Sequence, residues 1–148
     1  MPKKVRPIPK GFHAVTSSLV QVDATKTIDF CKKAFGAKLL MKIAAPGGKI
    51  AHAEIQIGDS IVMLNDEMQE PATPAGLFLY VEDVDKTFAK AVKAGATTVM
   101  EPQDMFWGDR FARVKDPSGN GWGIATHIED VDPKEMKKRA AKAFAGAG

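Results

Sequence analysis

The chain has 148 residues, of which 45% are hydrophobic and 26% charged, so it fits one globular domain or two small modules, and its apolar runs are too short to cross a membrane. Its net charge of +3 comes from the two ends of the chain. Residues 1–10 carry four Lys or Arg and no acid, and residues 132–148 carry five Lys or Arg and two acids, whereas the rest of the chain has a net charge of −4. This distribution excludes nucleic acid and membranes as expected partners, and with one cysteine and no apolar leader segment it favours a cytoplasmic protein.

The first half of the chain predicts one helix among four strands. Residues 13–22 are apolar and β-branched, which is typical of a strand. The segment 24–35 carries apolar residues at helical spacing, with Asp23 as its N-cap and Gly36 as its C-cap. Turn residues then separate three further predicted strands, over 37–44, 49–57 and 60–66.

The second half predicts the same order of elements after a proline-containing loop. A strand over 76–83 precedes a helix over 84–95 that ends in glycine. Three more strands are expected over 96–103, 109–116 and 121–129. A last helix is predicted over 132–144, with Asp132 as its N-cap and Pro133 at its first position.

Matching residues in the two halves indicate an internal repeat. Lys26-Thr27 and Lys86-Thr87 each stand just inside a predicted helix, about 60 residues apart. One βαβββ module buries too little apolar surface to be stable alone, so we expect two modules to pair. The predicted fold class is α+β, in which the two paired βαβββ modules form a curved, largely antiparallel eight-stranded sheet with helices on its convex side.

The expected domain organisation follows from this repeat. It comprises a basic N-terminal tail (1–11), a first module (12–70), a second module (71–130), and a C-terminal helix and tail (131–148). We expect the protein to associate with itself as a homodimer, and the sequence leaves open whether the modules pair within one chain or between chains.

Several segments of both halves together resemble one known group of proteins. They span about residues 12 to 142 and read IDFCKKAFGA, GKIAHAEIQIGDS, LYVEDVD, FWGDR and DPSGNGWGIATHIEDV. Their order is similar to that in the vicinal oxygen chelate superfamily, which includes glyoxalase I, extradiol dioxygenases and the bleomycin- and fosfomycin-resistance proteins, and more specifically to its PhnB-like branch. The resemblance implies the fold described above and leaves the reaction open, because one fold hosts many functions.

The resemblance also implies where a metal cofactor would lie. In the metal-dependent members, four side chains at the centre of the sheet bind a divalent cation, and their counterparts here are Thr16, Met63, Gly76 and Gly123. None of these side chains chelates such a cation well, so we expect no cofactor at this place. The two glycines predict room for a ligand instead, unless neighbouring side chains cover them.

A second set of metal ligands remains open. His52 and Glu54 lie two apart on a predicted strand, so their side chains point the same way, and His127 would complete a set of two histidines and one carboxylate. The alternative is a polar strand face that contacts water or a ligand in the cleft.

The apolar loop before residue 109 has two interpretations. Phe106 and Trp107 either cap the sheet or lie in a dimer interface, or they form a lid over a small molecule. As a lid, Trp107 would stack on a planar ligand and Arg110 would pair with its anionic group. The following DPSG segment predicts a type I turn from Asp116, and strand alternation then places Trp122 in the core.

These features support three functions from different classes. The first is a glyoxalase/bleomycin-resistance-like protein that binds a small molecule in the cleft of the curved sheet without the usual metal; its expected ligand-binding residues are Trp107, Arg110, Phe106, His52 and Glu54. The second is a metal-dependent lyase or dioxygenase with a rearranged site at His52 and Glu54. The third is a protein-interaction module that uses the apolar loop as its contact surface.

Overall fold

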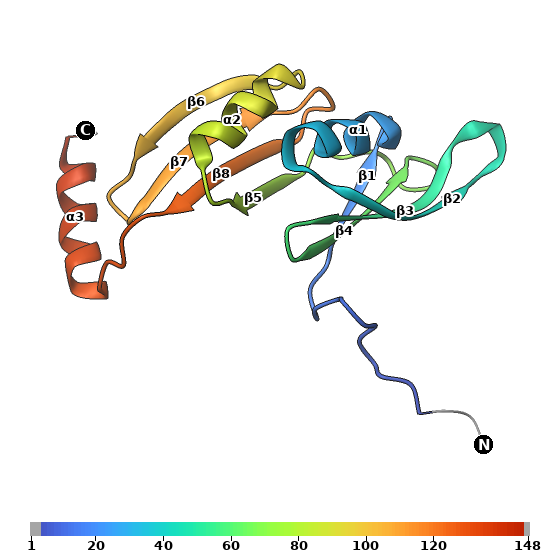
Figure 1. Cartoon of the computed structure of the whole chain (residues 1–148), viewed down its shortest axis with the longest axis horizontal. Coiled ribbons are helices and arrows are strands. Elements are labelled where there is room, and N and C mark those ends of the chain that lie inside the picture. The colour runs from blue at the N-terminus through green and yellow to red at the C-terminus, as the bar shows by residue number, and fades with distance from the viewer. Residues whose placement is uncertain (1–3, 147–148) are drawn as a thin grey trace. The chain divides into compact units, whose positions relative to one another are not determined.

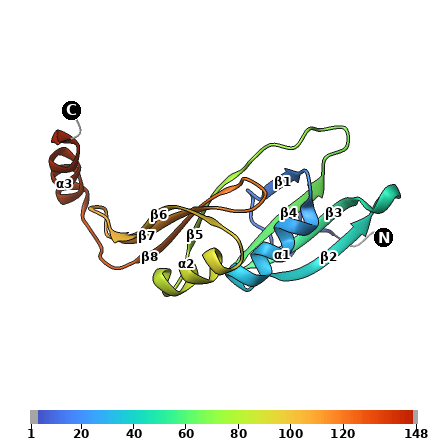
Figure 2. The ribbon, with the colours of Figure 1, turned by 90° about the horizontal axis from the view of Figure 1, so that it is seen from above.

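The computed structural model describes residues 4–146 and shows two compact units that divide between Ala75 and Gly76. Each unit contains one four-stranded sheet with a helix packed on one of its faces (Figures 1 and 2). The predicted α+β class and the two βαβββ modules are confirmed, and the eight strands form two hydrogen-bonded sheets of four strands each.

The first unit contains a mixed sheet in the strand order β1-β4-β3-β2, in which β1 runs parallel to β4 and the other pairs are antiparallel. Its elements are β1 (Ser17–Gln21), α1 (Ala24–Phe35), β2 (Lys38–Ala44), the short 3-10 helix η1 (Pro46–Gly48), β3 (Ile50–Ile57) and β4 (Ser60–Asp66).

The second unit repeats this arrangement in the strand order β5-β8-β7-β6, with β5 parallel to β8. Its elements are β5 (Gly76–Tyr80), α2 (Val84–Lys93), β6 (Thr97–Asp104), β7 (Asp109–Lys115), β8 (Gly121–His127) and a final helix, α3 (Pro133–Ala145). Most of the predicted elements have the predicted type and differ only by a few residues at their ends.

Two strands are clearly shorter than predicted. β1 begins at Ser17 rather than at residue 13, because its partner β4 starts only after a tight turn and pairs with β1 from Val62 onward. β5 ends at Tyr80 rather than at residue 83, because Asp83 instead accepts a hydrogen bond from the backbone N–H of Lys86 and caps α2.

Equivalent hydrogen bonds in the two units confirm the internal repeat. In the first unit, the backbone N–H of Ala24 at the start of α1 donates to the side chain of Asp66 at the end of β4. In the second unit, the backbone N–H of Val84 at the start of α2 donates to the side chain of Thr126 near the end of β8, and both residues lie 60 positions after their counterparts. Gly36 ends α1 in the left-handed conformation, as predicted.

Strand alternation gives the second sheet two different faces. The side chains that face α2 are buried and mostly apolar, and they include Ala112, Val114, Trp122 and Ile124. Trp122 is only 2% exposed, which confirms its predicted place in the core. The opposite face, which we call the open face, carries the alternate residues of β5, β7 and β8.

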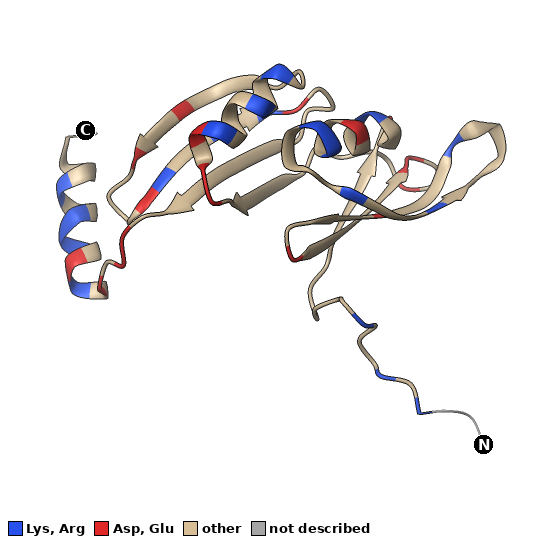
Figure 3. Ribbon diagram, in the orientation of Figure 1, with Lys and Arg blue, Asp and Glu red and all other residues tan. Residues whose placement is uncertain are grey.

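The basic residues predicted for the C-terminal segment lie on α3 (Figure 3). Asp132 caps this helix, and Arg139 anchors it to the rest of the second unit through Glu129 and the backbone carbonyl of Phe106. Within the described residues, no helix is long and apolar enough to cross a membrane.

Candidate ligand site on the second sheet

Two rows of aligned residues cross β5, β8 and β7 on the open face of the second sheet. The strand register sets one row as Phe78, Gly123 and Arg113, and the next as Gly76, Gly121 and Lys115. Three of these six residues are glycines, so the middle of the open face has backbone but no side chains to cover it.

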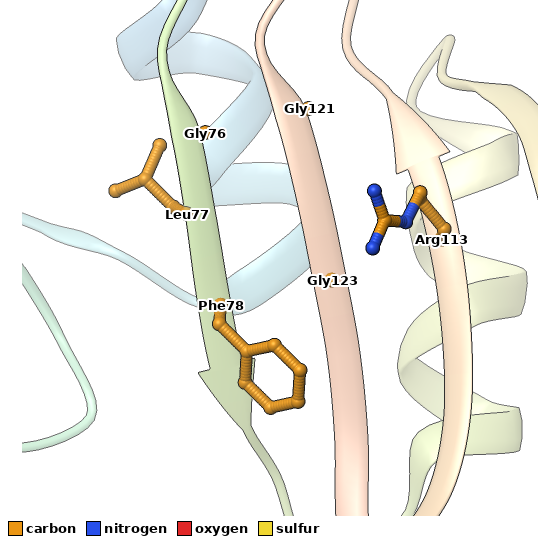
Figure 4. A pocket seen from close by; sticks show the side chains of 6 residues that line it. All are labelled: Gly76, Leu77, Phe78, Arg113, Gly121 and Gly123. Carbon is orange, nitrogen blue, oxygen red and sulfur yellow. The ribbon is translucent and has the colours of Figure 1, made fainter. Parts of the chain in front are cut away.

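A hollow of about 310 Å³ lies over these glycines. Its lining residues are Gly76, Leu77, Phe78, Arg113, Gly121 and Gly123. The ring of Phe78 and the guanidinium group of Arg113 approach β8 from its two sides, while Leu77 points away from β8 (Figure 4). The hollow therefore has an aromatic wall, a cationic wall and a floor of exposed backbone.

Gly123 cannot be replaced by a larger residue without moving its neighbours. A Cβ atom built there would lie 2.9 Å from Cδ2 of Phe78 and 3.0 Å from Cε2 of Phe111. Part of the room predicted at Gly123 is thus taken by two phenyl rings, which stack at 5.4 Å between centroids. The remaining room lies toward Gly76 and Gly121, where an added Cβ would meet nothing within 4 Å.

We expect Gly123→Ala to lower the free energy of unfolding by about 1–3 kcal/mol, because Phe111 is buried and cannot move away from the added methyl group. Gly121→Ala on the same strand is the matched control and should be neutral or slightly stabilising, since its Cβ would enter open space. Urea unfolding of the two variants measures the difference. Equal stability of the two would contradict the packing described at Gly123.

Six aromatic rings form a continuous series along the open face and onto α3. Neighbouring rings in the series lie 5.0–5.8 Å apart between centroids, in the order Tyr80, Phe78, Phe111, Trp107, Phe106 and Phe144. Phe78 is 51% exposed, whereas Phe111 beneath it is buried. The exposed ring of Phe78, stacked on Phe111, therefore offers a flat apolar surface at one side of the hollow.

A buried carboxylate holds two rings of this series in place. Asp109 is 1% exposed and accepts hydrogen bonds from the hydroxyl of Tyr80 (2.8 Å) and from Nε1 of Trp107 (2.9 Å). Nδ1 of His127 lies 2.8 Å from its other oxygen, and Nε2 of His127 lies 2.8 Å from the exposed Asp130. One carboxylate thereby orients two of the aromatic side chains.

The same hydrogen bonds shift the pKa values of this cluster. Burial acts to raise the pKa of Asp109, but hydrogen bonds from His127, Tyr80 and Trp107 outweigh it and lower that pKa. The hydrogen bond to Asp109, followed by that to Asp130, raises the pKa of His127, and the bond to Asp109 raises the pKa of Tyr80. The cluster thus favours a charged Asp109 beside a protonated His127.

The two predicted lid residues and Arg110 do not come together. Trp107 packs against Phe111 on the open face, and Phe106 packs against Trp107 and Phe144. Arg110 lies on the face that packs against α2, where it donates to both oxygens of Asp85 at 2.8 and 2.9 Å and to Asp104 at 3.0 Å. Its part in ligand binding stays a prediction.

His52 and Glu54 do meet, with 2.8 Å between Nε2 and Oε2, and both belong to the first unit. His127 belongs to the second unit and contacts Asp109 and Asp130. Across residues 4–146, no group of three or more His, Cys, Asp or Glu side chains has an arrangement that could hold a metal ion. The residues at the family's ligand positions do not fit a metal either, since Gly123 faces two phenyl rings.

Sequence reasoning missed Arg113 and did not place Phe78 among the ligand-binding residues. The signal for Arg113 was its alternation with Phe111 on β7, which places both on the face of Gly123. Asp109 was missed because an acid at the edge of a loop resembles a turn residue, and only the folded chain brings its three donors together.

A comparison with protein-family models identifies one group. A family model described as Glyoxalase/Bleomycin resistance protein/Dioxygenase superfamily matches residues 12–124. An uncharacterized protein of Mycobacterium bovis is 37% identical over 147 residues, which cover 91% of this chain and 95% of that protein.

Two solved structures are also similar. TioX from Micromonospora sp. ML1 has a TM-score of 0.67 and 29% identity, covering 78% of this chain and 99% of that one. TnmS3, described as an antibiotic binding protein from Streptomyces sp. CB03234, has a TM-score of 0.63 and 26% identity, covering 83% of this chain and 99% of that one.

Proposed function

The chain belongs to the glyoxalase/bleomycin resistance protein/dioxygenase superfamily, and we propose that it binds a planar aromatic small molecule in the hollow on the open face of the second sheet. The observation that carries the proposal is the combination of three glycines, an exposed phenyl ring and a guanidinium group around one hollow. Concave sites with apolar walls and one charged group are typical of small-molecule binding.

The similarity to TnmS3, which is described as an antibiotic binding protein, supports the binding of a small molecule. An aromatic ligand would lie with its plane against the ring of Phe78 and its edge over Gly121. Stacking against an aromatic ring contributes about 0.5–1.5 kcal/mol beyond the burial of apolar area. The glycine floor lets such a flat molecule approach the backbone of β8 closely.

We propose that binding does not require the metal ion of the family's enzymes. The chain has Thr16, Met63, Gly76 and Gly123 at the positions that the resemblance assigns to metal ligands, and glycine offers no ligand atom. The crowding of Gly123 by Phe78 and Phe111 supports the same view, because a carboxylate side chain would not fit there in this arrangement.

Three further parts of the proposal come from the sequence. The motifs FWGDR and DPSGNGWGIATHIEDV support a place in the PhnB-like branch of the superfamily. A single cysteine, which is buried, supports a reducing cytoplasmic environment. We also propose a homodimer, which the exposed apolar side chains Leu39, Leu40, Met41 and Ile43 of the edge strand β2 support.

We expect Phe78→Ala to weaken the binding of a neutral aromatic probe, naphthalene-2-carboxamide, by about tenfold, since it removes the stacking surface and its buried area. The measurement is a titration followed by amide chemical shifts, in which Gly76, Gly121 and Gly123 report on the hollow. Phe78 is half exposed, so the variant should fold normally.

Phe144→Ala is the matched control, because it removes an exposed phenyl group on α3 that does not line the hollow. It should leave probe binding within about twofold of the original. Unchanged binding to Phe78→Ala would contradict the proposed site. Loss of probe binding after removal of metal ions with a chelator would favour the metal-dependent alternative instead.

A further inference from the structure

Arg113 differs from the other two arginines of the second unit in having no carboxylate partner. Arg110 and Arg139 each form ion pairs with two acidic residues. Among the residues that the structure describes, no Asp or Glu lies within ion-pair distance of Arg113, and its guanidinium carbon instead lies 5.5 Å from the centre of the Phe111 ring. Its hydrogen-bond donors are therefore available to a ligand.

The surroundings of Arg113 are cationic. The two rows that cross the hollow contain Arg113 and Lys115, and the other residues of these rows on β5 and β8 are glycines and Phe78. The partners of the two cations on β6, Met100 and Thr97, are uncharged. Two positive charges thus stand together on this part of the open face with no carboxylate in their rows.

From this arrangement we propose that the ligand is an anionic aromatic molecule, and that Arg113 determines the specificity by pairing with its carboxylate or another planar oxyanion. The inference rests on the proposed function, because it concerns the same hollow. Phe78 would hold the aromatic ring, and the guanidinium group of Arg113 would reach the anionic group from the opposite side of β8 (Figure 4).

The chemistry of the two side chains explains why one molecule would satisfy both. The guanidinium group presents two parallel N–H donors that match the two oxygens of a carboxylate. Its cation–π contact with the Phe111 ring, at 5.5 Å, limits the freedom that Arg113 loses on binding. Lys115 adds a second positive charge in the neighbouring row, which attracts the anion without fixing its orientation.

The test compares two probes of the same shape, naphthalene-2-carboxylate and naphthalene-2-carboxamide, by calorimetry and by amide chemical shifts. We expect the original protein to bind the carboxylate about tenfold more tightly than the carboxamide, because the carboxylate forms charge-assisted hydrogen bonds with Arg113. Arg113→Gln should remove this preference and leave carboxamide binding within about twofold, and Arg113→Lys should restore only part of it.

Lys93→Gln is the matched control, because it removes one positive charge from the exposed surface of α2, which packs on the other face of the sheet. It should preserve the preference for the carboxylate. Equal binding of both probes at the hollow would overturn the anionic inference and leave the proposed function standing. A preference that survives in Arg113→Gln would overturn the role of Arg113.

The failure of the proposed function has a different signature. If neither probe shifts the amides of Gly76, Gly121 and Gly123, the hollow is not a binding site, and both the proposed function and the inference are wrong.

Discussion

Replacing Gly108 by alanine is expected to lower the free energy of unfolding by about 3 kcal/mol or more, among the largest effects of any single methyl group in the second unit. Gly108 has a φ of +100°, a conformation that residues with a side chain rarely adopt. A Cβ atom there would also overlap the backbone carbonyl oxygen of Glu129 and would crowd Val131.

The overlap matters because the backbone of Gly108 also forms hydrogen bonds with the segment that contains Glu129. Its carbonyl oxygen accepts hydrogen bonds from the N–H groups of Ile128 and Glu129, at 2.9 and 3.0 Å. These bonds join the loop before β7 to the chain that leaves β8 for α3. An added side chain would have to displace a main chain that is already fixed by two hydrogen bonds, and no rotamer change can relieve that contact.

Gly119→Ala separates the two causes of this loss. Gly119 has a similar φ of +92°, but an added Cβ would meet nothing within 4 Å. The free energy of unfolding of Gly119→Ala should therefore fall only by the cost of the backbone conformation, about 1 kcal/mol. Urea unfolding followed by tryptophan fluorescence suits both variants, because Trp107 and Trp122 both lie in the second unit. Equal losses for the two variants would show that the contact with Glu129 is unimportant.

The effect on the site would follow from the same displacement. Gly108 is next to Trp107, whose ring contacts Phe111 in the aromatic series of the open face. Movement of the loop would loosen this ring and the anchor between Arg139 and the carbonyl of Phe106. Gly108 thus links the fold of the loop to the aromatic wall of the proposed site, although it touches no ligand itself.

The sequence predicted the fold well because its signals were local and repeated. Asp23 and Asp132 cap helices as expected, and Gly36 ends the first one in a left-handed conformation. Alternation along β8 correctly separated the buried Trp122 from Gly123 on the other face. These signals depend on neighbouring residues in the chain, and they do not require knowledge of long-range contacts.

The site was harder to predict because it depends on which face of the sheet each side chain takes. The strand predicted over 109–116 is present, but the predicted lid grouped Arg110 with Trp107, and the sequence alone does not say which of Arg110 and Arg113 shares a face with that ring. In the structure β7 begins at Asp109, and strand alternation then turns Arg110 toward α2 and Arg113 toward the open face. A shift of one residue in the pairing register of β7 would have exchanged the faces on which the two arginines lie.

Buried carboxylates show a second limit of sequence reasoning. Asp66, Asp109 and Asp116 all occur at strand ends, where acids are typical of turns. In the folded chain all three are buried and accept hydrogen bonds from donors that are distant or not adjacent in the sequence. Their importance comes from tertiary contacts, and no spacing pattern in the sequence reports those contacts.

Asp116→Ala is the second change for which we expect a loss of about 3 kcal/mol or more, because hydrogen bonds to a buried charged acceptor are individually strong. The carboxylate of Asp116 is 4% exposed and accepts from the backbone N–H groups of Ser118 and Asn120, from Nδ2 of Asn120 and from Nε1 of Trp122, each at 2.9 Å. The predicted type I turn is present, with the N–H of Gly119 donating to the carbonyl of Asp116.

The substitution would remove one acceptor shared by both the turn and the core. Asn120 and Trp122 are 0% and 2% exposed, so water cannot easily replace the lost carboxylate. Asp116→Asn should recover only part of the loss, because its amide nitrogen would face the donors Nδ2 and Nε1. The turn between β3 and β4 offers the control. Asp59 is exposed there, and within residues 4–146 its side chain accepts a hydrogen bond only from Ser60, so Asp59→Ala should cost less than about 0.5 kcal/mol. If Asp116→Ala were as mild as Asp59→Ala in urea unfolding, the DPSGN segment would be an ordinary surface turn and not a buried anchor of the sheet that carries the proposed site.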